Sequence, residues 1–178
     1  MITSYNKLLK NQNKDFKYLI EYSNNDDVRK ISWRIFDELM IHYDDEIVHF
    51  LCSWYCHMEV DDFEIFGYKC FYYDIDPMVC EMNKKITNNV INKDVVFDDI
   101  EINEGIIVNK FCETCYPVGK IFKGKFVLVG SDNPHLSCIN QINSCQQIID
   151  QNELTKIHYK TTIKGKHNYY MVVGCNQV

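Results

Sequence analysis

The sequence has few residues that would divide a chain into separate units, with 7 glycines and 3 prolines among 178 residues. It contains no internal repeat, low-complexity tract or linker rich in proline or glycine, so nothing in it indicates a domain boundary. No apolar run approaches the roughly 18 residues of a membrane-spanning helix, and the N-terminal stretch lacks the apolar centre of a signal peptide. We therefore expect one soluble, intracellular domain over 1–178, with an N-terminal extension at 1–25 and a core at 26–178.

An excess of positive charge is also missing, because the formal net charge is -6. This balance argues against a broadly basic surface for nucleic acid and leaves only a local basic patch around "KIFKGK" as an alternative. We find no strong nucleic-acid signal and expect no membrane partner. The 9 cysteines are an odd number, and several lie inside apolar runs. We expect reduced, mostly buried thiols rather than a disulfide scaffold.

Short apolar runs alternate with segments of helical periodicity along most of the chain. Apolar residues from Val28 to Leu39 recur at helical spacing, whereas the nearly all-apolar run at 46–54 is typical of a strand covered on both faces. On the same grounds we expect helices at 26–43, 77–87 and 136–150, and strands at 46–54, 67–74, 94–99, 104–112, 124–132, 156–163 and 168–174. The alternation predicts an α/β fold with a doubly wound, mostly parallel sheet that ends in an antiparallel hairpin. The strand near 105–110 should lie beside the strand near 46–52.

Two acids and a proline follow the second buried strand, in "DIDP" (residues 74–77). In an open parallel sheet, ligands bind beyond the carboxyl ends of the strands, where the strand order reverses. Asp74 is therefore well placed to accept hydrogen bonds from both hydroxyls of a ribose. The alternative is that Asp74 and Asp76 cap the helix that Pro77 begins.

Several segments, taken in order, resemble the class I S-adenosylmethionine-dependent methyltransferases. They are "YDIDP", "IVNKFCE", "HLSCINQINSCQQI" and "NYYMVVG", and the resemblance covers roughly residues 28–174. It is closest to small methyltransferase-like proteins of tailed bacteriophages. The resemblance implies the Rossmann-like methyltransferase fold, S-adenosylmethionine as cofactor and an unidentified methyl acceptor. It also implies a location in the cytoplasm, which would be the host's if the protein is phage-encoded.

The resemblance also assigns roles to individual residues. Asp74, with Asp76 beside it, would bind the ribose, and Asp98 or Asp99 would bind the adenine amino group. Ser53 and Trp54 lie in the turn that would contact the methionine part of the cofactor. Asn109, Cys112 and Glu113 would line the pocket floor, with Glu113 as an acceptor contact or base and Cys112 as a candidate nucleophile. The alternatives are a surface acid for Glu113 and a buried structural thiol for Cys112.

The sequence departs from this family in the turn after the first strand. The family has a glycine-rich turn there, whereas this chain has "CSWYCHMEVDD" and no glycine before Gly67. The motif Asp/Asn-Pro-Pro-aromatic is also absent, which counts against N-methylation of adenine or cytosine. A catalytically inactive binding or assembly module with a protein partner is therefore the alternative function. Such a module could hold a structural zinc at Cys52, Cys56, Cys112 and Cys115, because the first and fourth strands are expected to be neighbours.

Overall fold

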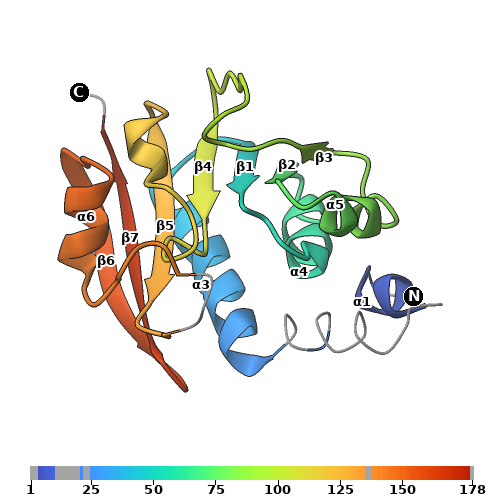
Figure 1. Cartoon of the computed structure of the whole chain (residues 1–178), viewed down its shortest axis with the longest axis horizontal. Coiled ribbons are helices and arrows are strands. Elements are labelled where there is room, and N and C mark those ends of the chain that lie inside the picture. The colour runs from blue at the N-terminus through green and yellow to red at the C-terminus, as the bar shows by residue number, and fades with distance from the viewer. Residues whose placement is uncertain (1–3, 11–20, 22–24, 135–137, 177–178) are drawn as a thin grey trace.

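The computed structural model describes residues 4–10, 21, 25–134 and 138–176. Its strands form a seven-stranded sheet in the order β3-β2-β1-β4-β5-β7-β6, with β3 and β6 at opposite edges (Figure 1). The strands are β1 (Ile47–Leu51), β2 (Lys69–Asp74), β3 (Val90–Asn92), β4 (Ile106–Asn109), β5 (Lys125–Ser131), β6 (Lys156–Lys164) and β7 (Asn168–Cys175). The helical segments are α1 (Ser4–Leu9), α3 (Asp26–His42), α4 (His57–Glu59), the π-helical turn η1 (Val60–Glu64), α5 (Pro77–Asn83), the 3-10 turn η2 (Val118–Lys120) and α6 (Cys145–Gln151).

The strand order reverses between β1 and β4. Val48 of β1 pairs in parallel with Cys70 of β2 on one side and with Ile106 of β4 on the other. β7 runs antiparallel to both β5 and β6. The predicted neighbourhood of the first and fourth strands and the antiparallel terminal hairpin are thus confirmed. In such a sheet the crevice for a ligand lies beyond the carboxyl ends of β1 and β4.

Alternating strand residues supply one apolar core on each face of the sheet. In β5, for example, Val127 and Val129 pack into the core that includes α3, whereas Phe126 and Leu128 pack into the core that includes α6. Helix α3 begins where the Asn25 side chain accepts hydrogen bonds from the N–H groups of residues 27 and 28. None of the helices in the described ranges is long and apolar enough to cross a membrane.

The strand expected at 94–99 is wrong. The third strand is β3 at Val90–Asn92, where Ile91 pairs with Tyr73, and residues 95–98 form a turn. The Asp94 side chain causes the difference, because its Oδ1 accepts hydrogen bonds from the N–H groups of Val96 (2.8 Å) and Phe97 (3.3 Å). Local side-chain bonds of this kind compete with strand pairing.

Two expected helices are shorter than predicted. The helix expected at 77–87 is α5 and ends at Asn83. The helix expected at 136–150 begins only at Cys145, because the Ser144 hydroxyl caps it by accepting a hydrogen bond from the Gln147 N–H. Residues 138–144 are not helical, and the first residues of that expected helix, 136 and 137, lie outside the described residues.

Candidate functional site

A pocket of about 680 Å³ opens at the carboxyl edge of the sheet. The loops after four strands supply most of its lining, and two halves of different chemistry can be distinguished. The charged half comes from the loops after β2 and β3 and consists of Asp74, Ile75, Asp76, Met78, Val79, Lys93, Asp94, Val95, Val96 and Phe97. The aromatic half comes mainly from the loops after β1 and β4 and consists of Cys52, Trp54, Tyr55, Phe111, Thr114, Cys115, Tyr116 and Ile139. The pocket therefore lies where parallel sheets of this topology bind ligands.

Asp74 lines the charged half and also joins two loops. Its Oδ2 accepts a hydrogen bond from the Trp54 N–H at 2.8 Å, and its Oδ1 accepts one from the Asp76 N–H at 2.9 Å. Burial raises the pKa of the Asp74 carboxyl above its ordinary value, while these N–H groups favour the charged form. Each carboxylate oxygen has two lone pairs, so further hydrogen bonds to a ligand remain available.

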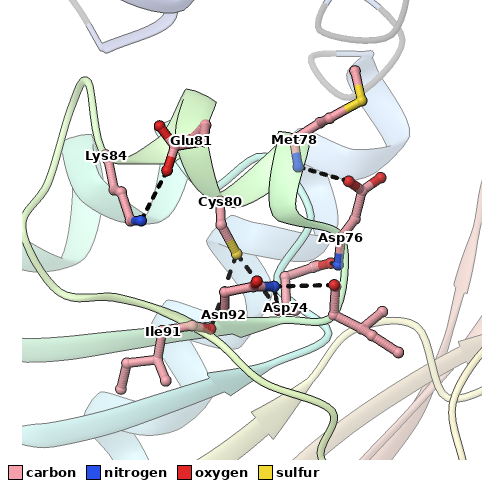
Figure 2. A network of polar contacts seen from close by, with 9 residues as sticks. Asp74, Asp76, Met78, Cys80, Glu81, Lys84, Ile91 and Asn92 are labelled. Carbon is pink, nitrogen blue, oxygen red and sulfur yellow. Dashed lines mark hydrogen bonds and ion pairs between the residues drawn. The ribbon is translucent and has the colours of Figure 1, made fainter.

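Asp76 has the capping role that the sequence left open. Its carboxylate accepts hydrogen bonds from the N–H groups of Met78 (2.8 Å) and Val79 (3.4 Å), and Pro77 occupies the first turn of α5. Figure 2 shows this cap next to the side-chain amide of Asn92, which donates to the Asp74 carbonyl at 2.9 Å. The network fixes the start of α5 against the ends of β2 and β3.

The turn after β1 contains two residues in a backbone conformation that glycine usually supplies. Cys52 and Trp54 have φ angles of 52° and 50°, in the left-handed region that ordinary residues rarely enter. Asn83 holds this turn from α5, because its Nδ2 donates to the Trp54 carbonyl oxygen at 2.6 Å and its Oδ1 accepts from the Cys56 N–H at 3.3 Å. The Ser53 N–H also donates to the Tyr73 carbonyl oxygen at 2.9 Å. Local hydrogen bonds therefore maintain a conformation that glycine usually supplies.

The residues expected to bind adenine are displaced from the pocket lining. Asp98 and Asp99 do not belong to that lining, which instead includes Lys93 and Asp94 just after β3. Asp98 supports the turn, since its Oδ2 accepts a hydrogen bond from the Asp94 N–H at 2.7 Å. The third strand ends earlier in the sequence than predicted, so Asp94 lines the pocket in place of Asp98 or Asp99.

The three residues predicted for the pocket floor are buried outside the lining. Both oxygens of Glu113 bond to Ser131, one to its hydroxyl at 2.7 Å and the other to its N–H at 3.1 Å. The Cys112 thiol donates to the Asn109 carbonyl oxygen at 3.6 Å, and burial raises its pKa well above the ordinary value. The Asn109 side chain accepts a hydrogen bond from the Phe111 N–H at 2.9 Å. Of these side chains only Glu113 bonds to another strand, at Ser131 of β5, and none of the three lines the pocket.

A disulfide joins Cys52 to Cys115 and thereby links the loops after β1 and β4. The expectation of free thiols fails for this pair and holds for the other seven cysteines. Cys56 and Cys112 are separate buried thiols, and no group of three or more His, Cys, Asp or Glu side chains suited to a metal occurs among the residues that the structure describes. The four cysteines therefore do not form the zinc site considered from the sequence.

Polar atoms in the turn after β1 retain hydrogen-bonding capacity. The buried Ser53 Oγ and Trp54 Nε1 have no hydrogen-bond partner within the described part of the chain. Ser53 itself does not line the pocket, whereas Trp54 does. The pocket thus presents the carboxylates of Asp74 and Asp94 to a ligand, and the Trp54 side chain also lines it.

No family model matches the sequence, and no curated protein matches it. Solved structures do match. The PH0226 protein from Pyrococcus horikoshii OT3 has a TM-score of 0.65 at 11% identity, covering 85% of this chain and 92% of that one. The N-methyltransferase NodS from Bradyrhizobium japonicum WM9, solved with S-adenosyl-L-homocysteine, has a TM-score of 0.63 at 12% identity, with coverages of 98% and 100%.

A third solved structure is magnesium protoporphyrin IX methyltransferase (ChlM) from Synechocystis PCC 6803 with bound S-adenosylmethionine. Its TM-score is 0.58 at 9% identity, and the match covers 96% of this chain and 89% of that one. At such low identities the similarity concerns the fold. The chain has the Rossmann-like fold of the class I methyltransferases, with antiparallel C-terminal strands.

Proposed function

We propose that the protein is an S-adenosylmethionine-dependent methyltransferase. The observation that supports this most directly is the position of Asp74, which lines the pocket at the end of β2 and bonds to the turn after β1. In that turn, Cys52 and Trp54 have left-handed φ angles, a conformation that the family's turn obtains from glycine. Both features lie at the edge where sheets of this topology bind nucleosides.

The residues of the pocket suit the two parts of such a cofactor differently. Asp74 would accept hydrogen bonds from the ribose hydroxyls, and the loop that begins at Asp94 would hold the adenine against Val95 and Phe97. The turn from Trp54 to Cys56 would contact the methionine part. S-adenosylmethionine supplies an electrophilic methyl group when it is bound.

Methyl transfer is an in-line displacement in which positioning can supply much of the rate. The pocket walls would orient the acceptor and exclude water. Because Glu113 and Cys112 lie outside the pocket lining, this proposal assigns neither side chain a role as base or nucleophile. We therefore assign catalysis to orientation, with a base needed only where the acceptor must lose a proton first.

Titration calorimetry with S-adenosylhomocysteine tests this function. Asp74→Asn should weaken binding about ten- to a hundredfold, since a lost charged hydrogen bond is worth about 1.5 to 3 kcal/mol. Asp37→Asn, on the exposed face of α3, is the matched control and should bind as the wild type does. If Asp74→Asn binds as tightly as the wild type, Asp74 has no ribose role.

The second candidate is a catalytically inactive module that binds a partner protein. The Trp54 side chain favours it, because it lines the pocket in a turn where the family's glycines leave room for the methionine part. Undetectable binding of S-adenosylhomocysteine at millimolar concentration would support this candidate over the enzyme. Phage origin and a location in the host cytoplasm remain predictions from sequence resemblance.

A further inference from the structure

Among the residues that the structure describes, none of the side chains that line the aromatic half of the pocket is charged. All charged lining residues, Asp74, Asp76, Lys93 and Asp94, belong to the charged half. An anionic ligand in the aromatic half would lose water without gaining an ion pair, which is unfavourable. The lining therefore selects against an acceptor that carries a negative charge at this end.

The aromatic half also lacks a general base among the described residues. Glu113 lies close in sequence, but Ser131 binds both of its oxygens and it is outside the lining. Burial raises the pKa of the Tyr55 hydroxyl above its ordinary value of about 10, so this group stays protonated near neutral pH. A nucleophile that reacts here must already have a free lone pair.

Aromatic rings form the wall of this half. The ring centroids of Trp54 and Phe111 lie 5.8 Å apart at an interplanar angle of 47°, and Tyr55 lies 6.1 Å from Trp54. At the rim, Tyr116 and Ile139 remain 45% and 67% exposed. Aromatic side chains favour flat partners, which they contact by offset stacking or edge to face.

We propose that the aromatic half binds the methyl acceptor, and that this acceptor is a flat, uncharged heteroaromatic small molecule with a nucleophilic nitrogen. This inference rests on the methyltransferase function proposed above. The nitrogen lone pair forms the new bond to the methyl carbon while the sulfur–methyl bond breaks, and the electron pair of that bond stays on sulfur. A nitrogen that carried a proton releases it to water, whereas a ring nitrogen without one keeps the positive charge.

The two tryptophans of the chain give a direct test by nuclear magnetic resonance. Trp54 lines the aromatic half, whereas Trp33 is 50% exposed on α3 and serves as an internal control. Trp33→Phe assigns the two indole N–H signals. Quinoline, which is flat, uncharged and carries a ring nitrogen, should shift the Trp54 signal saturably and leave the Trp33 signal in place.

Two further probes and two variants test which kind of ligand the aromatic half accepts. Naphthalene-2-carboxylate is flat but anionic and cyclohexanol is uncharged but not flat, so both should bind at least tenfold more weakly than quinoline. Phe111→Leu keeps an apolar side chain without the aromatic face and should weaken quinoline binding about three- to tenfold. Phe66→Leu makes the same change at an exposed position outside the pocket lining, so it should not change quinoline binding.

The outcomes separate this inference from the proposed function. If S-adenosylhomocysteine binds but quinoline leaves the Trp54 signal unmoved, or if either other probe binds as well as quinoline, the acceptor class is wrong and the enzyme assignment stands. If quinoline binds and S-adenosylhomocysteine does not, the aromatic half is a ligand site of a protein that is not a methyltransferase, and both the acceptor role and the enzyme assignment fail.

Discussion

The side-chain amide of Asn83 donates a hydrogen bond of 2.6 Å to the carbonyl oxygen of Trp54. Asn83 is fully buried at the end of α5 and does not line the pocket. It acts through the turn after β1, which it contacts at Trp54 and Cys56. The conformation of the turn after β1 therefore depends on a residue that does not line the pocket.

Asn83→Ala should lower the free energy of unfolding by about 1 to 3 kcal/mol, because it leaves buried backbone groups without partners. It should also weaken S-adenosylhomocysteine binding, since the turn is no longer fixed. Urea denaturation and calorimetry measure the two effects. Asn103→Ala, at an exposed position, should change neither, and full retention of affinity in Asn83→Ala would contradict the positioning role.

Trp54→Gly should strengthen cofactor binding. Glycine adopts a φ near 50° without the cost of roughly 1 kcal/mol that other residues incur, and it removes a side chain from the turn. Glu153→Gly is the matched control, because Glu153 has a φ of 54° but lies outside the pocket lining. Only Trp54→Gly should raise the affinity for S-adenosylhomocysteine in calorimetry. Weaker binding would mean that the indole itself contacts the cofactor.

Glu113→Gln should destabilise the fold without changing cofactor affinity. The two carboxylate oxygens of Glu113 accept hydrogen bonds from Ser131. In the variant, an amide nitrogen that can only donate replaces one of these oxygens at a buried position. We expect a loss of about 1 to 3 kcal/mol in urea denaturation, with the dissociation constant of S-adenosylhomocysteine unchanged. A loss of methyl transfer in a variant of normal stability would restore Glu113 as a catalytic candidate.

His57 should make the protein less stable in mild acid. Burial lowers the pKa of its imidazole to about 4, although the nearby Glu59 opposes this effect. The unfolded imidazole has a pKa of about 6.5, so between pH 6.5 and pH 4 the unfolded chain binds more protons and stability falls as the pH falls. Between pH 7 and pH 5 this contribution amounts to about 2 kcal/mol.

Urea denaturation at pH 7 and pH 5 measures this dependence. His57→Gln removes the titrating group. Between the two pH values, its free energy of unfolding should therefore fall by about 2 kcal/mol less than that of the wild type. An equal loss in both proteins would show that other groups cause the acid sensitivity.

The disulfide between Cys52 and Cys115 predicts a pattern of chemical protection. When the protein is purified without reductant and then denatured in the presence of an alkylating reagent, mass spectrometry should detect seven alkylated cysteines rather than nine. Reduction should lower the unfolding free energy by about 2 to 4 kcal/mol, because the bond closes a long loop of the unfolded chain. Cys115→Ser should match the reduced wild type, and nine adducts before reduction would contradict the bond.

The sequence predicted the sheet well because its buried strands carry a strong local signal. The apolar residues around Val48 and Tyr72 identified two neighbouring parallel strands, and Asp74 located the ligand edge. The strand β3 has three residues, too few for a pattern, and the Asp94 side chain turned the following segment away from the sheet. The adenine-side candidates were therefore displaced along the chain.

Other residues that line the pocket or fix its turns could not be found from local sequence pattern. Asn83 contacts a backbone 27 to 29 residues away, so its role depends on how α5 packs against the turn. Phe111 lies near the end of the strand predicted at 104–112 and Tyr116 follows it, but only the three-dimensional structure shows that both line the pocket. Glu113 and Cys112 had the right chemistry and the right place in sequence, and their side chains are instead buried outside the pocket lining.

The outermost strand, β6, leaves nine residues along an open edge of the sheet. Long unpaired edges can recruit strands from other chains and start aggregation. Exposed and half-buried residues alternate along β6, and Lys156, Lys160 and Lys164 all occupy exposed positions. Because these lysines are spaced along β6, their positive charges would repel the same edge of a second copy of the protein. They should therefore help to prevent pairing between the edges of two folded molecules.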